Sequence, residues 1–155
     1  MFRHLLVLIA LTFAGAVSAG DQQPDWTAVE DETMRHFQAI LRLDTSNPPG
    51  NEYLVVDYLK SVLEREGIEV KTFALDPQRP NLVARLRGSG KKRPLLIMGH
   101  TDVVTVDATK WTHPPFSATR DGGYVYGRGT VDDKDNVVAG LVTMLQLKRL
   151  SATLP

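Results

Sequence analysis

The chain has 155 residues, enough for one ordinary domain with a buried core, and its 43% hydrophobic and 23% charged residues are typical of a folded globular protein. Its 18 basic and 18 acidic residues give a formal net charge of zero with no block of like charges, so nothing indicates nucleic acid or an anionic membrane as a partner. Because the chain contains no cysteine, disulfides cannot stabilise it.

The first 19 residues have the pattern of a secretory signal. Arg3 precedes an apolar run from about Leu5 to Ala16, and small side chains stand at Val17 and Ala19. A transmembrane anchor is the alternative, but a membrane span needs roughly 20 apolar residues. We therefore predict a signal peptide over residues 1–19 that is cleaved after Ala19. The expected destination is the periplasm or the medium, with no stable membrane anchor.

Two helices are predicted next. The first starts at Asp25 or Thr27 and stops near Asp44, with Glu30 placed to complete a capping box with Thr27. Residues 45–51, "TSNPPGN", form a loop because two prolines and a glycine cannot continue a helix. A second helix is expected over residues 52–66, with Gly67 as its C-terminal stop.

Strands follow the second helix. Residues 68–75 and 81–88 read as a hairpin or as neighbouring strands, separated by the turn "DPQRP". Residues 93–100, "RPLLIMGH", are too uniformly apolar for a half-exposed strand and predict an interior strand covered on both faces. Helices mixed with such strands indicate a layered α/β domain, with its chemistry at the carboxyl ends of strands.

His100 and Asp102 stand at that expected strand end. Neutral imidazole is a good zinc ligand, and a metal-bound histidine usually donates its other N–H to a carboxylate. Residues two apart on extended backbone point to the same side, so Asp102 fits as an orienting carboxylate or an acid–base assistant. The alternative is a histidine that caps the strand and an aspartate that starts a turn, and H-x-D alone does not decide between them.

A second constellation is the glycine-rich segment 122–136, "GGYVYGRGTVDDKDN", which leads to Asp132 and Asp133 at the start of an amphipathic helix. Carboxylates at a helix start also have an ordinary explanation, since they complement the helix dipole. Known glycine-rich motifs do not match. The dinucleotide fingerprint lacks its third glycine, and a calcium loop starting at Asp133 fails at Val137.

Together the segments "GHTDVV", Trp111, Pro115-Phe116 and "YGRGTVDDK" resemble the M20 family of zinc metallopeptidases and amidohydrolases. That family includes aminoacylases, glutamate carboxypeptidases and succinyl-diaminopimelate desuccinylases. The resemblance extends to "DTSNPPGNE" and "NLVARLRG" and so covers nearly all of the chain after residue 19. It implies a three-layer, mixed-sheet zinc-exopeptidase catalytic domain of the phosphorylase/hydrolase-like type, with residues 20–155 as its N-terminal part.

The resemblance also implies a site that binds two metal ions. Zinc is the expected metal, and cobalt and manganese are the alternatives. His100 would bind one zinc, Asp102 would be the catalytic aspartate beside it, and Asp132 would bridge both metals. Asp133 and Lys134 match the residues that follow the bridging aspartate, where the family often has a cis peptide. The substrates implied are peptides or N-acyl amino acids.

Other parts of the family's apparatus have no counterpart in this sequence. The parts that would follow residue 155 are a Glu-Glu pair, a further carboxylate ligand, a late histidine and the lid domain. The resemblance also leaves open a homodimer formed through that lid domain. The expectation is therefore an exported carboxypeptidase- or deacylase-type hydrolase that is truncated and inactive as this chain and binds metal weakly. The alternatives are a short non-catalytic metal-binding or interaction module and the product of a disrupted gene.

The remaining residues of interest have mainly structural interpretations. His4 lies in the expected signal. His36 falls inside the first helix, where a solvated or core-edge role outweighs metal binding, and a loop role is favoured for His113. Trp111 and Phe116 are interpreted as packing anchors, with substrate contact as the lesser alternative.

Overall fold

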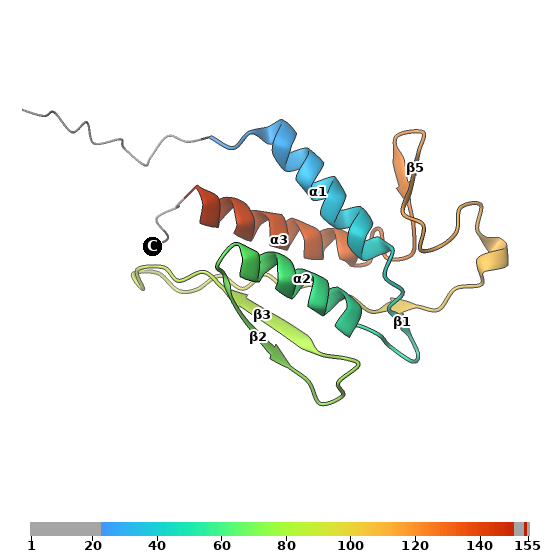
Figure 1. Cartoon of the computed structure of the whole chain (residues 1–155), viewed down its shortest axis with the longest axis horizontal. Coiled ribbons are helices and arrows are strands. Elements are labelled where there is room, and N and C mark those ends of the chain that lie inside the picture. The colour runs from blue at the N-terminus through green and yellow to red at the C-terminus, as the bar shows by residue number, and fades with distance from the viewer. Residues whose placement is uncertain (1–22, 151–153, 155) are drawn as a thin grey trace, which may run out of the picture.

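The computed structural model describes residues 23–150 and residue 154. Three helices pack together, and a two-stranded hairpin lies against the second of them (Figure 1). This is the mixed α/β architecture that the sequence predicts. The signal peptide predicted over residues 1–19 lies outside the described residues. Within those that are described, no helix is long and apolar enough to cross a membrane.

Helix α1 spans Trp26–Leu41 and begins as a polar cap predicts. The carboxylate of Asp25 accepts hydrogen bonds from the backbone N–H groups of Thr27 and Ala28, at 3.1 and 3.2 Å, so Asp25 is the cap and Thr27 lies within the first turn. The helix ends at Leu41, before the predicted stop near Asp44. The carbonyl oxygens of Ile40 and Leu43 both accept hydrogen bonds from the side chain of Lys134, and that of Ile40 also accepts the N–H of Leu43.

Helix α2 spans Tyr53–Arg65 and agrees closely with the predicted helix over residues 52–66. Gly67, at a φ of +67°, ends it in the left-handed conformation that glycine adopts easily. One side of α2 packs into the core that this helix shares with the other helices and with the hairpin. The buried residues of α2 are Val55, Val56, Leu59, Val62 and Leu63.

Strands β2 (Glu69–Phe73) and β3 (Asn81–Arg85) form the predicted hairpin. They pair antiparallel, with Glu69 opposite Arg85 and Phe73 opposite Asn81. The turn between them folds back towards the start of α2, where the N–H of Tyr53 donates to the carbonyl of Gln78 at 3.1 Å.

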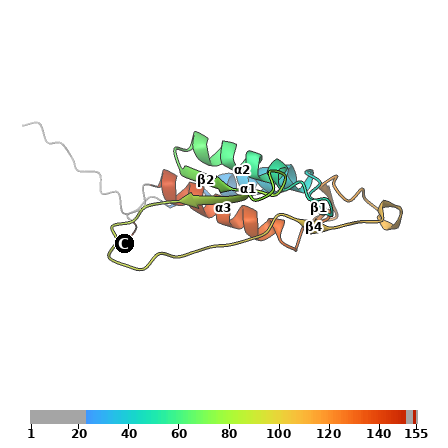
Figure 2. The same cartoon turned by 90° about the horizontal axis from the view of Figure 1, so that it is seen from below.

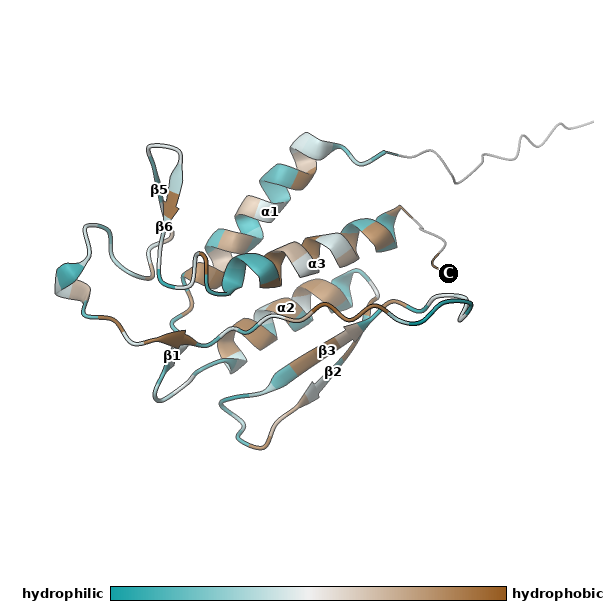
Figure 3. Cartoon of the chain, turned by 180° about the vertical axis from the view of Figure 1, so that it is seen from behind, coloured by the Kyte–Doolittle hydropathy of each residue, from teal (hydrophilic) through white to brown (hydrophobic). Residues whose placement is uncertain are grey.

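The interior strand predicted over residues 93–100 is wrong for this structure. The segment has no regular secondary structure, and it runs beside the helices as an unpaired connection between β3 and β4 (Figure 2). Leu95 is 86% exposed and Met98 76% exposed, and Figure 3 colours part of this connection brown. Its apolar pattern predicts burial, but a strand also requires hydrogen-bonded neighbours, and no described segment pairs with it.

Two short pairings complete the strands. β4 (Val103–Val104) pairs in parallel with β1 (Ser46–Asn47), which brings the loop after α1 next to the chain that follows His100. β5 (Thr119–Asp121) and β6 (Tyr124–Tyr126) form a separate antiparallel hairpin. A short 3-10 turn, η1 (Ala108–Lys110), lies between β4 and β5.

Helix α3 spans Lys134–Arg149 and packs against α1 and α2. The predicted amphipathic face is largely buried, since Val138, Leu141 and Leu145 belong to the core and Val137 and Met144 pack on its edge. Gly99 lies close to this helix, because a Cβ on Gly99 would lie 2.8 Å from Val137 Cγ2.

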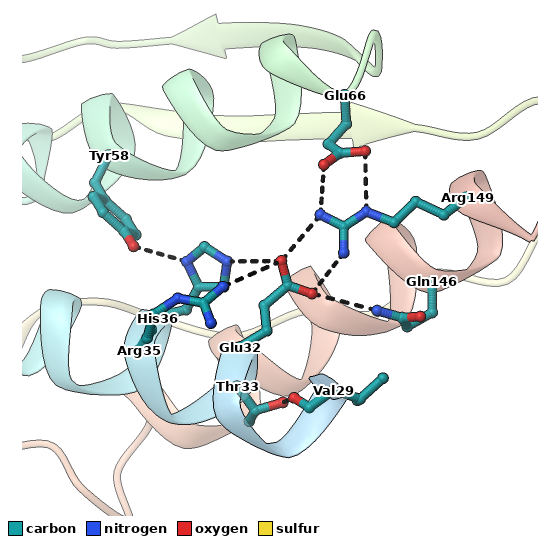
Figure 4. Close-up of polar contacts among 9 residues, drawn as sticks. All are labelled: Val29, Glu32, Thr33, Arg35, His36, Tyr58, Glu66, Gln146 and Arg149. Carbon is teal, nitrogen blue, oxygen red and sulfur yellow. Dashed lines mark hydrogen bonds and ion pairs between the residues drawn. The ribbon is translucent and has the colours of Figure 1, made fainter. Parts of the chain in front are cut away.

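A polar cluster joins the three helices near the C-terminal end of α3 (Figure 4). Arg149 donates from Nη1 and Nη2 to Glu32 at 2.6 and 3.0 Å, and it also binds Glu66 at the end of α2. His36 lies beside Glu32 and bonds through Nδ1 to the hydroxyl of Tyr58, at 2.7 Å. Glu32, His36, Tyr58, Glu66 and Arg149 are called the helix cluster below.

Candidate functional site

The structure brings His100, Asp102 and Asp132 together at the start of α3. Nε2 of His100 lies 2.8 Å from Oδ1 of Asp132, and Nδ1 lies 3.1 Å from Oδ1 of Asp102. The imidazole ring therefore stands between two carboxylates that come from opposite sides. This contact joins residues 32 positions apart in the sequence.

Backbone pairing on the 101–104 side fixes where Asp102 stands. The N–H of Val103 donates to the carbonyl of Thr45 at 3.1 Å, and the hydroxyl of Thr45, which is fully buried, donates to the carbonyl of Thr101. β1 and β4 share only two residue pairs, and these bonds add to them, so that Asp102 stands beside the loop that follows α1.

Lys134 anchors the segment that carries Asp132 to the C-terminal end of α1 and the loop after it. Lys134 is completely buried, and its ammonium group donates to the carbonyls of Ile40 and Leu43, at 3.1 and 2.8 Å. Burial lowers the pKa of Lys134 to about 8, although the charge of Asp44 opposes that shift. The peptide bond between Asp132 and Asp133 is cis.

Asp133 also holds this segment in place, through hydrogen bonds to His100 and Asn136. Its Oδ2 accepts the backbone N–H of His100 at 3.2 Å, and its Oδ1 accepts the side-chain amide of Asn136. The bond from Asn136 is the main cause that lowers the pKa of the Asp133 carboxyl. Asp133 thus ties the backbone at His100 to the first turn of α3.

The protonation of His100 reflects both neighbours. Burial alone would lower the pKa of this imidazole, but the hydrogen bonds to Asp132 and to the backbone of Asp102, together with the two carboxylate charges, raise it above its ordinary value. The two carboxylates therefore favour the protonated ring, in which both nitrogens carry a proton.

A shallow pocket of about 130 Å³ opens over these residues. Arg128 lies on its wall, with its guanidinium 5.3 Å from the ring centre of Trp111. Nε of Arg128 is buried and has no hydrogen-bond partner among the described residues. The residues that line the pocket are Asn47, His100, Asp102, Val103, Val104, Arg128 and Asp132.

Arg79 is a contributor that the sequence reasoning missed. Its Nη2 lies 2.8 Å from Oε1 of Glu52 and 3.8 Å from Oδ2 of Asp102. The turn sequence "DPQRP" gives no signal for this role, because the contact depends on the hairpin folding back over the start of α2.

The donor set fits part of a zinc site. Imidazole nitrogen and carboxylate oxygen are both zinc ligands, and Nε2 of His100 and Oδ1 of Asp132 already face each other at the pocket. A zinc ion needs three or four protein ligands, and within residues 23–150 no group of three or more histidine, aspartate or glutamate side chains is arranged to hold a metal. The described residues therefore supply two ligands of an incomplete set.

The other candidate residues lie outside this pocket. His36 is buried at the edge of the core beside Tyr58, as expected of a structural histidine. His113 stacks on Tyr126, with ring centres 4.4 Å apart, and faces Asp121 at 3.8 Å. Trp111 is half-buried under Arg128, which matches its interpretation as a packing anchor.

The chain is similar in sequence to known proteins. The sequence model of the family described as Peptidase family M20/M25/M40 matches residues 96–155. A probable succinyl-diaminopimelate desuccinylase of Staphylococcus epidermidis is 38% identical over 124 residues, which cover 79% of this chain and 30% of the relative. An N-formyl-4-amino-5-aminomethyl-2-methylpyrimidine deformylase of Halalkalibacterium halodurans is 34% identical, with 81% and 30% covered.

A solved structure shares the fold as well. The crystal structure of an M20 family metallo-carboxypeptidase from Sulfolobus solfataricus superposes with a TM-score of 0.70 and 28% sequence identity, over 78% of this chain and 28% of that one. The chain spans about 30% of the length of the curated relatives that it matches.

Proposed function

The chain belongs to the M20 peptidase family, and from this premise we propose that it forms part of a metal-dependent hydrolase of amide bonds in peptides or N-acyl amino acids. The observation that carries the proposal is the placement of His100 between Asp102 and Asp132 at an open pocket. The names of the relatives, a desuccinylase, a deformylase and a carboxypeptidase, all describe hydrolysis of an amide or peptide bond.

In this proposal each side chain has a separate task. His100 and Asp132 hold zinc through Nε2 and Oδ1, the two atoms that face each other at 2.8 Å. Asp102 accepts the N–H at Nδ1 of His100 through its backbone carbonyl, at 3.0 Å, and its carboxylate, at 3.1 Å, and so favours the tautomer that leaves Nε2 free to bind. Bound zinc supplies Lewis acidity and a water of lowered pKa.

Arg128 and the pocket wall orient the substrate. The guanidinium of Arg128 stacks on Trp111 beside the three site residues and offers hydrogen-bond donors to a polar group of the substrate. Because the described residues supply an incomplete ligand set, we propose that further ligands and the general base belong to parts of the enzyme beyond this chain. The chain alone then binds zinc weakly and does not turn substrate over.

Zinc titration of the purified chain, followed by calorimetry, tests the metal site. We expect binding that His100→Ala and Asp132→Ala each abolish. His113→Ala is the matched control, because His113 also faces a carboxylate but lies outside the pocket. Zinc binding that is equally strong in the His100 and His113 variants would refute the site.

Hydrolysis assays separate the proposed enzyme from a non-catalytic metal-binding module. Joining the chain to the remaining two thirds of a relative such as the desuccinylase should give metal-dependent hydrolysis of an N-acyl amino acid that Asp102→Ala removes. A correctly folded, zinc-loaded hybrid with no such activity would favour the binding module instead.

A further inference from the structure

We infer that Arg79 and Glu52 form a positioning pair that holds the carboxylate of Asp102 against His100. The inference rests on the proposed function only in naming His100 as a metal-site residue. It assigns a task to a hairpin turn that lies outside the sequence segments around His100 and Asp132.

Glu52 fixes Arg79 in place. The Glu52 side chain is only 8% exposed, and its Oε1 accepts a hydrogen bond from Nε of Arg79 at 3.0 Å and lies 2.8 Å from Nη2. A charge-assisted hydrogen bond and a close ion-pair contact to one nearly buried carboxylate oxygen restrict the planar guanidinium. Arg79 is therefore a fixed group rather than a freely moving surface arginine.

The backbone around this pair is shaped for close approach. Gly50 has a φ of +85°, and a Cβ on it would lie 2.8 Å from Nε of Arg79 and 2.9 Å from Oε2 of Glu52. Any larger residue there would push the pair apart. The bond from the N–H of Tyr53 to the carbonyl of Gln78 holds the turn against the start of α2.

From this fixed position Arg79 reaches Asp102. Its Nη2 lies 3.8 Å from Oδ2 of Asp102, while Oδ1 of the same carboxylate lies 3.1 Å from Nδ1 of His100. A positive group on one oxygen and an imidazole N–H on the other oppose rotation of the carboxylate. The ordered contacts then run from Glu52 through Arg79, Asp102 and His100 to Asp132.

Stability alone does not account for the arrangement. Oε2 of Glu52 is buried without a hydrogen-bond partner among the described residues, and a buried carboxylate with an unpaired oxygen is costly. Arg79 and Asp102 are both about 40% exposed, where an ion pair contributes little to folding. Holding Asp102 in one orientation is a role that this geometry does serve.

The first test needs no metal. Nitrogen-15 NMR of the full chain at about pH 9, above the ordinary imidazole pKa, reports whether the proton of His100 resides on one ring nitrogen. We expect two widely separated ring-nitrogen shifts in the unmodified chain. The separation should shrink in Arg79→Ala and Glu52→Gln, because the Nδ1 proton is then held mainly by the backbone carbonyl of Asp102, at 3.0 Å. Arg87→Ala is the matched control, because it removes the exposed pair with Glu69 from the same hairpin.

If the separation between the two ring-nitrogen shifts of His100 is the same in Arg79→Ala as in Arg87→Ala, the inference is overturned. Because this readout involves no metal, it decides the inference even if the chain fails to bind zinc, which would count against the proposed function alone.

A double-mutant cycle on zinc affinity is the second test. If Arg79 acts through Asp102, Arg79→Ala should weaken zinc binding about tenfold in the otherwise unmodified chain, which is the lower end of the effect for groups that orient a metal ligand. The same substitution should have no further effect on zinc binding in the Asp102→Ala background. A purely structural role would instead cause the same loss in both backgrounds, and that result would contradict the inference.

Discussion

Lys134 reaches across 94 sequence positions to donate a hydrogen bond to the carbonyl of Ile40, at 3.1 Å. It thereby satisfies the free carbonyl end of α1 while it anchors the start of α3, two residues after Asp132. One wholly buried side chain therefore links the first helix to the segment that carries a proposed metal ligand.

Replacing Lys134 by methionine should destabilise the chain strongly. The variant keeps the volume of the buried stem but leaves the partly buried carbonyl of Leu43 without this donor and the carbonyl of Ile40 with only the N–H of Leu43, at 3.3 Å. An unsatisfied buried group costs about 1–3 kcal/mol. Urea unfolding monitored by circular dichroism measures the change. Lys148→Met, on an exposed position of the same helix, is the control and should unfold like the parent chain.

Gly129→Ala separates crowding from backbone strain when it is compared with Gly123→Ala. Both glycines have φ near +86°, at +87° and +85°, but a Cβ at 129 would lie 2.8 Å from Cγ1 of Val103, whereas nothing lies within 4 Å at 123. We expect a loss of about 1 kcal/mol from strain at 123 and a clearly larger loss at 129. Equal losses in thermal unfolding would show that the segment around Gly129 relaxes freely.

Acid should destabilise the protein through the helix cluster. The hydrogen bond from Arg149 lowers the pKa of Glu32 below its usual 4.5, so the stability that this carboxylate contributes is present above pH 4.5 and is lost as pH falls through its folded value. Burial lowers the pKa of His36 below 6.5, so the unfolded state takes up more protons below that pH and stability falls in the same direction.

Urea midpoints measured from pH 7 down to about pH 3.5 test this expectation. Arg149→Met should lower the midpoint at pH 7 and flatten its fall in acid, because Glu32 loses the partner that depresses its pKa. Lys60→Ala removes an exposed ion pair with Glu64 and should leave the slope unchanged. An acid slope in Arg149→Met as steep as in the parent would place the pH dependence elsewhere.

The exposed apolar segment around residues 95–98 should cause the purified chain to self-associate. Leu95, Leu96 and Met98 are each at least 75% exposed and adjoin one another, and exposed apolar patches of this kind favour association. Serine at these three positions should lower binding of the dye ANS and reduce self-association in sedimentation. Leu75→Ser, at an exposed leucine outside this segment, is the control and should change both much less.

Export remains to be tested by processing. If residues 1–19 are a secretory signal, expression of the full sequence in a bacterial host should yield a chain that begins at Gly20, recovered outside the cytoplasm. Amino-terminal sequencing and cell fractionation measure this. A chain that keeps Met1 in the cytoplasm would contradict the prediction.

Local signals account for the parts of the fold that the sequence predicts well. The cap at Asp25 and the stop at Gly67 depend on neighbours within three residues, and both helices begin or end where those residues indicate. The apolar run over residues 93–100 predicts a buried strand, but pairing is decided by neighbours far along the chain, and the structure leaves the run unpaired.

The candidate site divides in the same way. The motifs around His100 and Asp132 predict that these residues belong together through family resemblance, and the structure places them in contact. No motif marks Arg79, because its approach to Asp102 arises only when the hairpin turn folds over the start of α2. Contacts that depend on such folding carry no local pattern to read.

The parallel pairing of β1 with β4 involves only two residues from each strand. A ladder this short can open with little loss of buried surface while α1, α2 and α3 stay packed. Asp102 directly precedes this ladder, so a brief opening would separate it from Asn47 and the pocket and then let the site re-form. Amide hydrogen exchange should therefore be faster at Val103 than in the helical core, and the protein would gain and lose its site without unfolding.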